Sequence, residues 1–194
     1  MLSKKTADRT RQLVNQYIVY HFDMDGVIAR WNENVPLERV SAPGYFLTCD
    51  PQENIIQVMK YLQENGKQVR ILGKVFNDRA AAEKRMWLKK HGVTGVPIQF
   101  ITMDEDKGNY VDLAKFNVLV DDYTPNLMAF EAMGPGCMGI KFRNQVNGTK
   151  GRWQGPSISH EAKPHEIYEE LVEAAESGLC DFHGRIFYPK SLIL

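Results

Sequence analysis

This 194-residue chain has few cysteines, a formal net charge of zero and no long apolar run, and each of these features excludes a class of protein. The three cysteines, Cys49, Cys137 and Cys180, are far apart and form neither the paired spacing of a zinc site nor a disulfide framework. No apolar stretch approaches the roughly 18 residues that a membrane-spanning helix needs, and charged residues interrupt any signal-peptide pattern near the start. We therefore expect a cytoplasmic protein with no membrane partner.

A surplus of positive charge is also missing, because lysine plus arginine and aspartate plus glutamate both number 24. A protein that grips a nucleic-acid backbone usually carries excess basic groups, so nucleic acid is not the expected partner. The length and the ordinary composition indicate one globular domain over residues 1–194, long enough to bury a substantial core.

Short apolar runs alternate with helical patterns along the chain. Strands are expected at 18–23, 68–72, 98–102, 116–120 and 138–142, and helices at 51–65, 77–91, 126–133 and from Pro164 to just before Gly178. Ala81, Met86 and Leu88 are expected on the inner face of the second helix. The alternation predicts an α/β fold, a three-layer α/β/α Rossmann-like parallel sheet. The segment 29–50 does not fit this pattern and is expected to form a small cap insert over the site.

Acidic residues follow two of the expected strands. Asp23 and Asp25 come after the first strand, and Asp121 and Asp122 come after the fourth. Because the carboxyl ends of parallel strands meet at one edge of a sheet, we expect these four residues to converge. Each cluster alone is also compatible with ordinary turn chemistry. Both clusters at one edge would repel without a cation, and this favours a site for a hard cation such as Mg²⁺.

Three motifs in this sequence resemble those of a known family. HFDMDGV at 21–27 is similar to the first motif of the haloacid dehalogenase superfamily, and VLVDDYTPNL at 118–127 is similar to the fourth. DEDKGNYV supplies Lys107 where the lysine of the third motif would stand. Together with PGYF at 43–46 and the stretch IKFRNQVNGTKGRWQG, the motifs resemble 5'(3')-deoxyribonucleotidase-like proteins. The resemblance spans about residues 18–145 and preserves the motif order.

The resemblance implies a Mg²⁺-dependent phosphohydrolase and a role for each matching residue. Asp23 would attack phosphorus and become an aspartyl-phosphate, and Asp25 would act as general acid and base while its backbone carbonyl binds the metal. Asp121 would bind Mg²⁺ directly, and Asp122 would act through water or by orienting the site. Lys107 would neutralise phosphate charge and hold Asp23, although a lysine in a polar loop is ordinarily just solvated.

One position departs from the family pattern. The second motif should end its strand with Ser or Thr, whose hydroxyl binds the phosphate, but the aligned residue is Gly73. Glycine can still offer its backbone N–H, and the adjacent Lys74 either compensates as a phosphate ligand or turns outward by strand alternation. The missing hydroxyl keeps open a different class of function, a catalytically weakened phosphoryl-ligand-binding or regulatory protein.

The expected substrate is a small phosphate ester, with a nucleoside monophosphate as the leading interpretation. Trp31, Tyr45 and Phe46 of the insert are candidates to stack on a base, or else to pack in the core. A phosphatase of polynucleotide ends is a further interpretation, which a small cap favours and a net charge of zero disfavours. The apolar tail GRIFYPKSLIL is expected to pack on its own domain or to mark a homodimer contact.

Overall fold

A single parallel sheet forms the centre of the molecule. The computed structural model describes residues 14, 16–148 and 151–187. Within this part of the chain the sheet has six strands in the order β3-β2-β1-β4-β5-β6. The strands are β1 (Ile18–Phe22), β2 (Gln68–Val75), β3 (Ile98–Thr102), β4 (Phe116–Asp121), β5 (Cys137–Arg143) and β6 (Ser157–Ser159).

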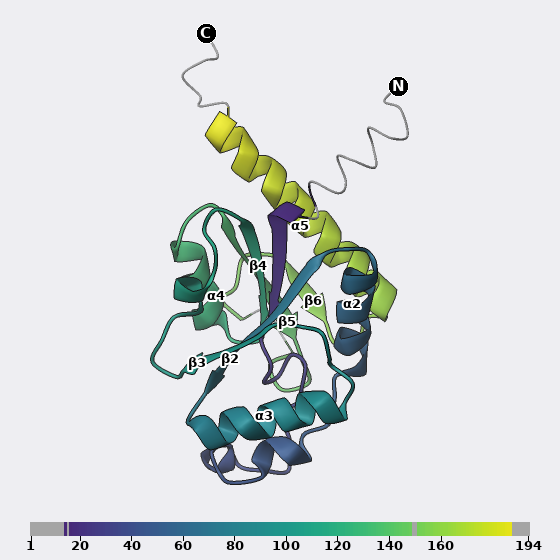
Figure 1. Ribbon diagram of the computed structural model, residues 1–194, viewed down its shortest axis with the longest axis vertical. Helices are drawn as coiled ribbons and strands as arrows, with labels where there is room; N and C mark the ends of the chain where they lie inside the picture. Colours follow the sequence, from purple (N-terminus) through teal and green to yellow (C-terminus); the bar gives the residue numbers. More distant parts are fainter. Residues whose placement is uncertain (1–13, 15, 149–150, 188–194) are drawn as a thin grey trace.

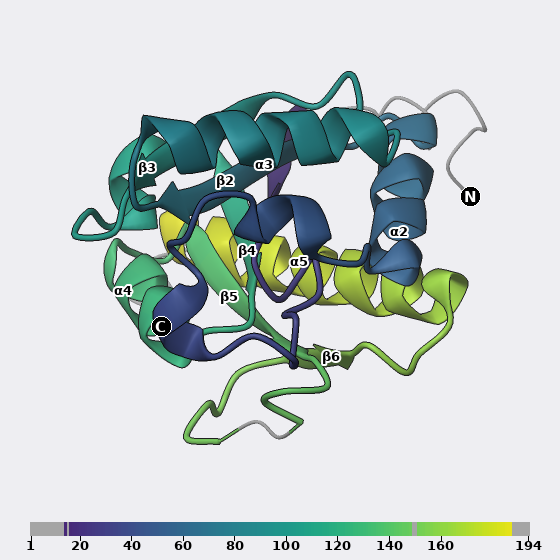
Figure 2. The ribbon, with the colours of Figure 1, turned by 90° about the horizontal axis from the view of Figure 1, so that it is seen from below.

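Four α-helices and three 3-10 helices follow β1 in the described residues. The α-helices are α2 (Glu53–Glu64), α3 (Asp78–Lys90), α4 (Thr124–Ala132) and α5 (Pro164–Phe187), and the 3-10 helices are η1 (Leu37–Arg39), η2 (Tyr45–Thr48) and η3 (Lys107–Tyr110). The helices α2 and α5 pack together on one face of the sheet, and α4 covers the other face (Figures 1 and 2). This arrangement confirms the predicted α/β fold.

The two central strands fix the position of the site. Every residue of β1 and β4 is buried, as expected of strands covered on both faces, and the two pair in parallel from Ile18 to Phe22. Their carboxyl ends therefore stop side by side. The helix α3 lies across this end of the sheet, with the 3-10 helices of segment 29–50 beneath it (Figure 1).

The structure corrects two expectations about the chain after the fourth motif. The strand β6 was not predicted, because its three residues contain one apolar side chain, Ile158. The last helix does not end before Gly178 but continues through it to Phe187. A Cβ at Gly178 would lie 2.8 Å from Phe116 Cζ and 3.0 Å from Met138 Sδ, so the missing side chain lets the helix approach the sheet closely.

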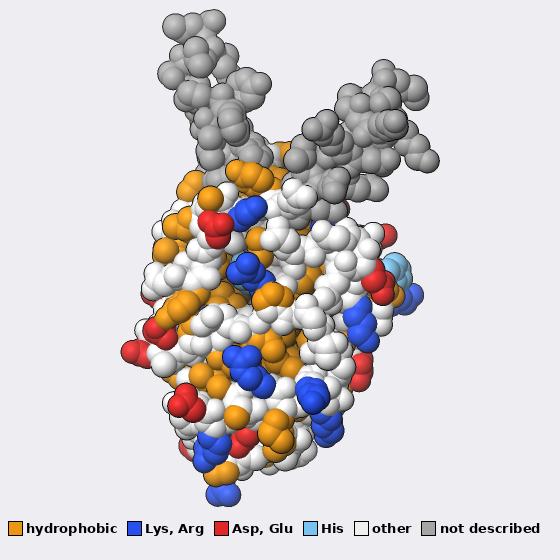
Figure 3. All heavy atoms as spheres, viewed as in Figure 1, with side chains coloured by type: hydrophobic (Ala, Val, Ile, Leu, Met, Phe, Trp, Pro, Cys, Tyr) orange, Lys and Arg blue, Asp and Glu red, His pale blue; other side chains and the backbone are white. Residues whose placement is uncertain are grey.

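The surface gives no sign of a single-sign charge patch on the face shown in Figure 3. Basic and acidic side chains are scattered there, and apolar side chains gather over β2 and β3. Within the described residues, no helix has both the length and the apolar character to cross a bilayer. Residues 188–194 of the apolar tail lie outside the described residues, so its packing or dimer contact stays a prediction.

Gly178→Ala is expected to lower the free energy of unfolding. In a helix interior without such crowding, replacing glycine by alanine would instead stabilise the helix by about 1 kcal/mol. The added methyl group would crowd Phe116 and Met138, and overpacking of this kind typically costs about 1–3 kcal/mol. Equilibrium urea denaturation measures the change in the free energy of unfolding. Ser177→Ala, at the neighbouring exposed position of the helix, is the control and should change it by less than about 1 kcal/mol. A Gly178→Ala protein as stable as the control would contradict the close packing.

Candidate active site

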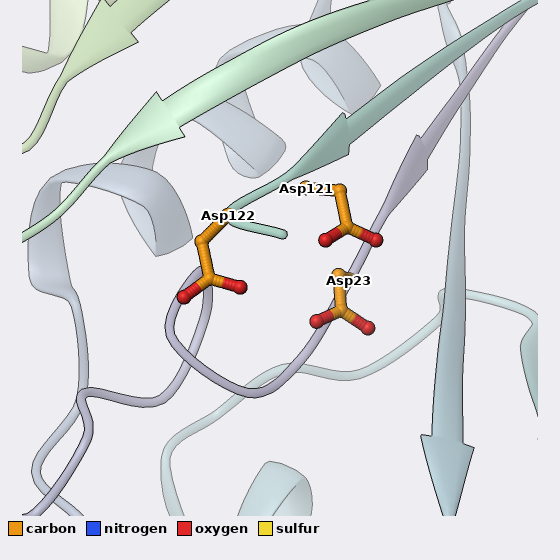
Figure 4. Close-up of side chains that lie close together, drawn as sticks. All are labelled: Asp23, Asp121 and Asp122. Atoms are coloured by element: carbon orange, nitrogen blue, oxygen red, sulfur yellow. The ribbon is translucent and has the colours of Figure 1, made fainter. Parts of the chain in front are cut away.

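Three carboxylates meet at the carboxyl ends of β1 and β4. Asp23 directly follows β1, Asp121 is the last residue of β4, and Asp122 comes next. The backbone N–H of Asp23 donates to Val120 O at 2.9 Å, which ties the two strand ends together. One oxygen from each of the three carboxylates lies within 4.8 Å of the others, and all three side chains point into one space (Figure 4). The predicted convergence is therefore observed for Asp23, Asp121 and Asp122, whereas the carboxylate of Asp25 does not belong to this group.

Lys107 joins two of these acids. Its Nζ lies 2.6 Å from Asp23 Oδ1 and 2.6 Å from Asp121 Oδ2, and its side chain is almost completely buried. Burial opposes the charge, but the two carboxylates raise the pKa of Lys107 above its ordinary value, so the ammonium stays charged. The following residue, Gly108, is needed to bring η3 this close, because a Cβ there would collide with Met133 at the end of α4.

Asp121 is held rigidly by the start of α4. Its Oδ1 accepts a hydrogen bond from the backbone N–H of Tyr123 at 2.8 Å, and its Oδ2 accepts from Asn126 Nδ2 at 3.0 Å as well as from Lys107. Burial raises the pKa of Asp121, and the nearby Lys107 lowers it. The first turn of α4 thus fixes one carboxylate of the site in a single orientation.

Asp122 is held by Trp31, which was expected to stack on a base or to pack in the core, and by Asn144, to which the sequence assigned no role. Its Oδ2 accepts from Trp31 Nε1 at 2.9 Å and from Asn144 Nδ2 at 2.8 Å. Burial, with the neighbouring carboxylates of Asp121 and Asp23, raises the pKa of Asp122 to about 7. When all three acids are ionised, their charge exceeds that of Lys107 and of Lys141, whose Nζ donates to the backbone carbonyl of Asp122.

The loop after Asp23 needs a glycine at position 26. Gly26 has φ of 75°, and a side chain there would collide with the carboxylate of Asp122 and the indole of Trp31. The structure therefore shows Trp31 as a hydrogen-bond donor to Asp122. Tyr45 and Phe46 are both buried in the main core cluster, which fits the packing alternative for these two rings.

Asp25 points to a different partner from the other three acids. Its Oδ2 lies 2.6 Å from Lys84 Nζ, and its Oδ1 is buried with no hydrogen-bond partner among the described residues. Burial raises the pKa of the Asp25 carboxyl, an effect that Lys84 opposes.

Lys84 was missed in the sequence, although helical periodicity contains the signal. It lies at i+4 from buried Ala80 and at i−4 from buried Leu88, so all three occupy one face of α3. Met86, which was expected on that inner face, is 61% exposed, so that expectation was wrong.

The two residues of the second motif face in different directions. A Cβ at Gly73 would lie 3.6 Å from Asp23 Oδ1 and 3.3 Å from a ring carbon of Phe100, so this position adjoins the expected nucleophile. Lys74 donates from its Nζ to Met103 O at 3.2 Å. A phosphate-binding role for either residue stays a prediction.

The carboxylate cluster fits a hard divalent cation. Asp122 Oδ1 receives no hydrogen bond from any residue that the structure describes, and carboxylate oxygens are donors of the kind Mg²⁺ prefers. Asp23, Asp121 and Asp122 would hold the ion, which would offset the excess negative charge. The carboxylate of Asp25 lies outside this group, and the expected contact of its backbone carbonyl stays a prediction.

Two solved structures share this fold, although no protein-family model and no curated protein matches the sequence. The first is D,D-heptose 1,7-bisphosphate phosphatase from Burkholderia thailandensis, with a TM-score of 0.55 and 14% identity over 79% of this chain and 97% of that one. The second is D,D-heptose 1,7-bisphosphate phosphatase from B. bronchiseptica complexed with magnesium and phosphate, with a TM-score of 0.55 and 15% identity over 80% and 98%. At these identities the likeness establishes the fold.

Mg²⁺ is expected to raise the melting temperature of the protein. A ligand that binds only the folded state stabilises it by about 2.7 kcal/mol at one hundred times its Kd. Asp122→Ala should remove most of this increase, because it deletes one of the three carboxylates. Calorimetry of each variant with and without Mg²⁺ measures the shift independently of any change in the metal-free protein.

Glu173→Gln is the matched control for this experiment, because Glu173 is an exposed acid on α5 outside the cluster. It should keep the full Mg²⁺ shift. An undiminished shift in Asp122→Ala would remove Asp122 from the ligand set. A response to Zn²⁺ with none to Mg²⁺ would show that the hard-cation assignment is wrong.

Proposed function

We propose that this protein is a Mg²⁺-dependent phosphomonoester hydrolase that works through an aspartyl-phosphate on Asp23. The observation that carries the proposal is the cluster of Asp23, Asp121 and Asp122 with Lys107 bridging the first two at 2.6 Å. A carboxylate can attack an anionic phosphate only where positive charge offsets the repulsion between them. Lys107 and a bound cation would supply that charge. The fold shared with two phosphatases supports the same activity.

The residues of the site have distinct tasks in this reaction. Because Lys107 occupies Asp23 Oδ1, the second oxygen of Asp23 attacks phosphorus while the bond to the leaving oxygen breaks. Asp25 gives its proton to that oxygen. Asp25 then takes a proton from a water molecule that attacks the phosphorus, which releases inorganic phosphate and restores Asp23. When bound, Mg²⁺ screens the charge between Asp23 and the phosphate.

The proposed substrate is a small phosphate ester, and a nucleoside monophosphate is the first candidate. It rests on the resemblance of the motifs to nucleotidase-like proteins. The neighbours in fold act, by their names, on a heptose bisphosphate, so sugar phosphates belong in the same screen. The net charge of zero supports a small ester over a polynucleotide end.

A weakened phosphoryl-ligand-binding protein is the second candidate function. It is favoured by Gly73, which offers no hydroxyl to the phosphate and has the Phe100 ring close by. The site nevertheless retains Asp25, half-buried and paired with a lysine, and a protein that only binds phosphate has no need of a general acid. Hydrolysis is therefore the better-supported function.

Asp23→Asn is expected to lower phosphatase turnover by about 10³-fold or more, because an amide cannot act as the nucleophile. The assay would screen nucleoside monophosphates, sugar phosphates and p-nitrophenyl phosphate with Mg²⁺ and again with excess chelator. Asp50→Asn makes the same change at an exposed position outside the cluster and should keep full activity. Wild-type turnover by the folded Asp23→Asn protein, or full activity in chelator, would refute the mechanism.

Gly73→Ser is expected to raise kcat/KM. One hydrogen bond to a charged group is worth about 1.5–3 kcal/mol, or roughly 10–150-fold in rate if it forms mainly in the transition state. The position allows a side chain in backbone terms, because Gly73 is not among the glycines with positive φ, and its tightest neighbour is the half-buried Phe100 ring.

Gly73→Ala is the matched control, because it adds the Cβ without the hydroxyl and should bring no gain. A fall in kcat/KM with both substitutions would show that Phe100 cannot move and that the glycine is required. Lys74→Ala belongs in the same series. If kcat/KM collapsed with Lys74→Ala and fell with Gly73→Ser, Lys74 would be the phosphate ligand that replaces the missing hydroxyl.

A further inference from the structure

The helix α3 and residues 41–50 form one unit over the carboxyl end of the sheet (Figure 2). Three hydrogen bonds join the two parts: Trp87 Nε1 to Cys49 O at 2.8 Å, Gly44 N to Glu83 Oε1 at 3.0 Å, and Arg79 Nη2 to Ser41 O at 2.7 Å. These hydrogen bonds fix α3 against residues 41–50 at three points along the helix. Any side chain that the unit sends toward the site is held by the same packing.

Lys84 is the charged side chain that this unit buries against the site. It is 1% exposed, and its Nζ lies 2.6 Å from Asp25 Oδ2 and 2.6 Å from Lys74 O. The ring of Phe46, from η2, lies 4.4 Å from the ammonium and closes a further side of it. A buried lysine without partners would be strongly destabilising, so these contacts hold the ammonium in place.

The contact constrains one oxygen of Asp25 and leaves the other available. Lys84 occupies Oδ2, whereas Oδ1 is buried and receives no hydrogen bond from any described residue. A buried carboxyl oxygen without a partner needs a ligand or water to satisfy it. With Oδ2 fixed, rotation of the carboxyl group is suppressed, and Oδ1 keeps one direction.

From this geometry we propose that Lys84 is a positioning residue for proton transfer by Asp25, an inference that rests on the hydrolase proposed above. Lys84 holds Oδ2 so that Oδ1 carries the proton. That proton passes to the leaving oxygen as the phosphorus–oxygen bond breaks and the bond from Asp23 to phosphorus forms. In the second half of the reaction, Oδ1 takes a proton from the attacking water. In this role Lys84 acts through Asp25 alone.

Esters with different leaving groups separate this role from a general effect on the fold. Phenyl phosphate has a basic leaving oxygen that needs a proton, whereas the leaving oxygen of 2,4-dinitrophenyl phosphate departs without one. General acid catalysis contributes about 10²–10⁴-fold where a proton is needed. The quantity to measure is kcat/KM, because it reports the steps up to departure of the leaving group and excludes hydrolysis of the aspartyl-phosphate.

Lys84→Met is expected to lower kcat/KM by about 10²-fold on phenyl phosphate and by less than about threefold on 2,4-dinitrophenyl phosphate. Asp25→Asn should show the same dependence on the leaving group, with a larger loss of kcat/KM on phenyl phosphate. Lys84→Gln keeps a polar group at the buried position, so it provides a second variant if Lys84→Met does not fold. The kcat/KM of Lys84→Gln should also fall mainly on phenyl phosphate.

Lys67→Met is the matched control, because Lys67 is also a buried lysine in a single ion pair, 3.1 Å from Glu176. It precedes β2 and so lies at the end of the sheet away from the carboxylates. Its kcat/KM should match the wild type on both esters. Equal losses on the two esters for both Lys84 variants would overturn the positioning role and place Lys84 in phosphate binding or in folding.

The same measurements separate failure of this inference from failure of the proposed function. If the folded wild-type protein with Mg²⁺ hydrolyses neither ester, the hydrolase proposal is wrong and the role of Lys84 falls with it. If the wild type hydrolyses both and the Lys84 variants lose the same factor on each, the positioning role alone is overturned.

Discussion

The ammonium of Lys107 lies between the carboxylates of Asp23 and Asp121, 2.6 Å from an oxygen of each, and the site depends on this contact. Two buried carboxylates side by side would otherwise repel, and one of them would be forced to take up a proton. The contact exists because η3 packs tightly against the end of α4, where Gly108 leaves room for Met133. A loop lysine thereby becomes part of the interior, and Asp23 keeps one oxygen for chemistry.

The other carboxylates are controlled by different means. Asp122 is held by neutral donors, Trp31 and Asn144, which orient the carboxylate without cancelling its charge. The resulting excess of negative charge is what a divalent cation would offset. Asp25 instead receives a lysine from α3. Two acids of one loop, Asp23 and Asp25, are thus paired with two different lysines.

The sequence predicted the sheet and the acid cluster for simple physical reasons. The strands β1 and β4 are buried on both faces, so each appears as an unbroken apolar run, and parallel pairing brings Asp23 and Asp121 to one edge. The close approach of Lys107 could be expected only through the resemblance of the motifs, since a lysine in a polar loop is ordinarily solvated.

Other features could not be predicted because the decisive contact is made by distant residues. Gly178 looks like a helix stop in the sequence, and only the positions of Phe116 and Met138 show that it serves close packing. Lys84 has the spacing of an inner-face residue, but lysine is almost never fully buried without a partner, and Asp25 lies far from it in the chain. Tertiary partners, not local propensity, decide both positions.

The central claim is that Asp23 itself carries the phosphoryl group during turnover. The direct test is to mix the protein with Mg²⁺ and excess 2,4-dinitrophenyl phosphate, quench in acid during steady-state turnover, digest the chain and locate any added phosphoryl group by mass spectrometry. The account predicts one phosphoryl group on the peptide that contains Asp23, absent in Asp23→Asn. Label on another residue would contradict it, as would an initial burst of dinitrophenol, one per protein molecule, with Asp23 unmodified.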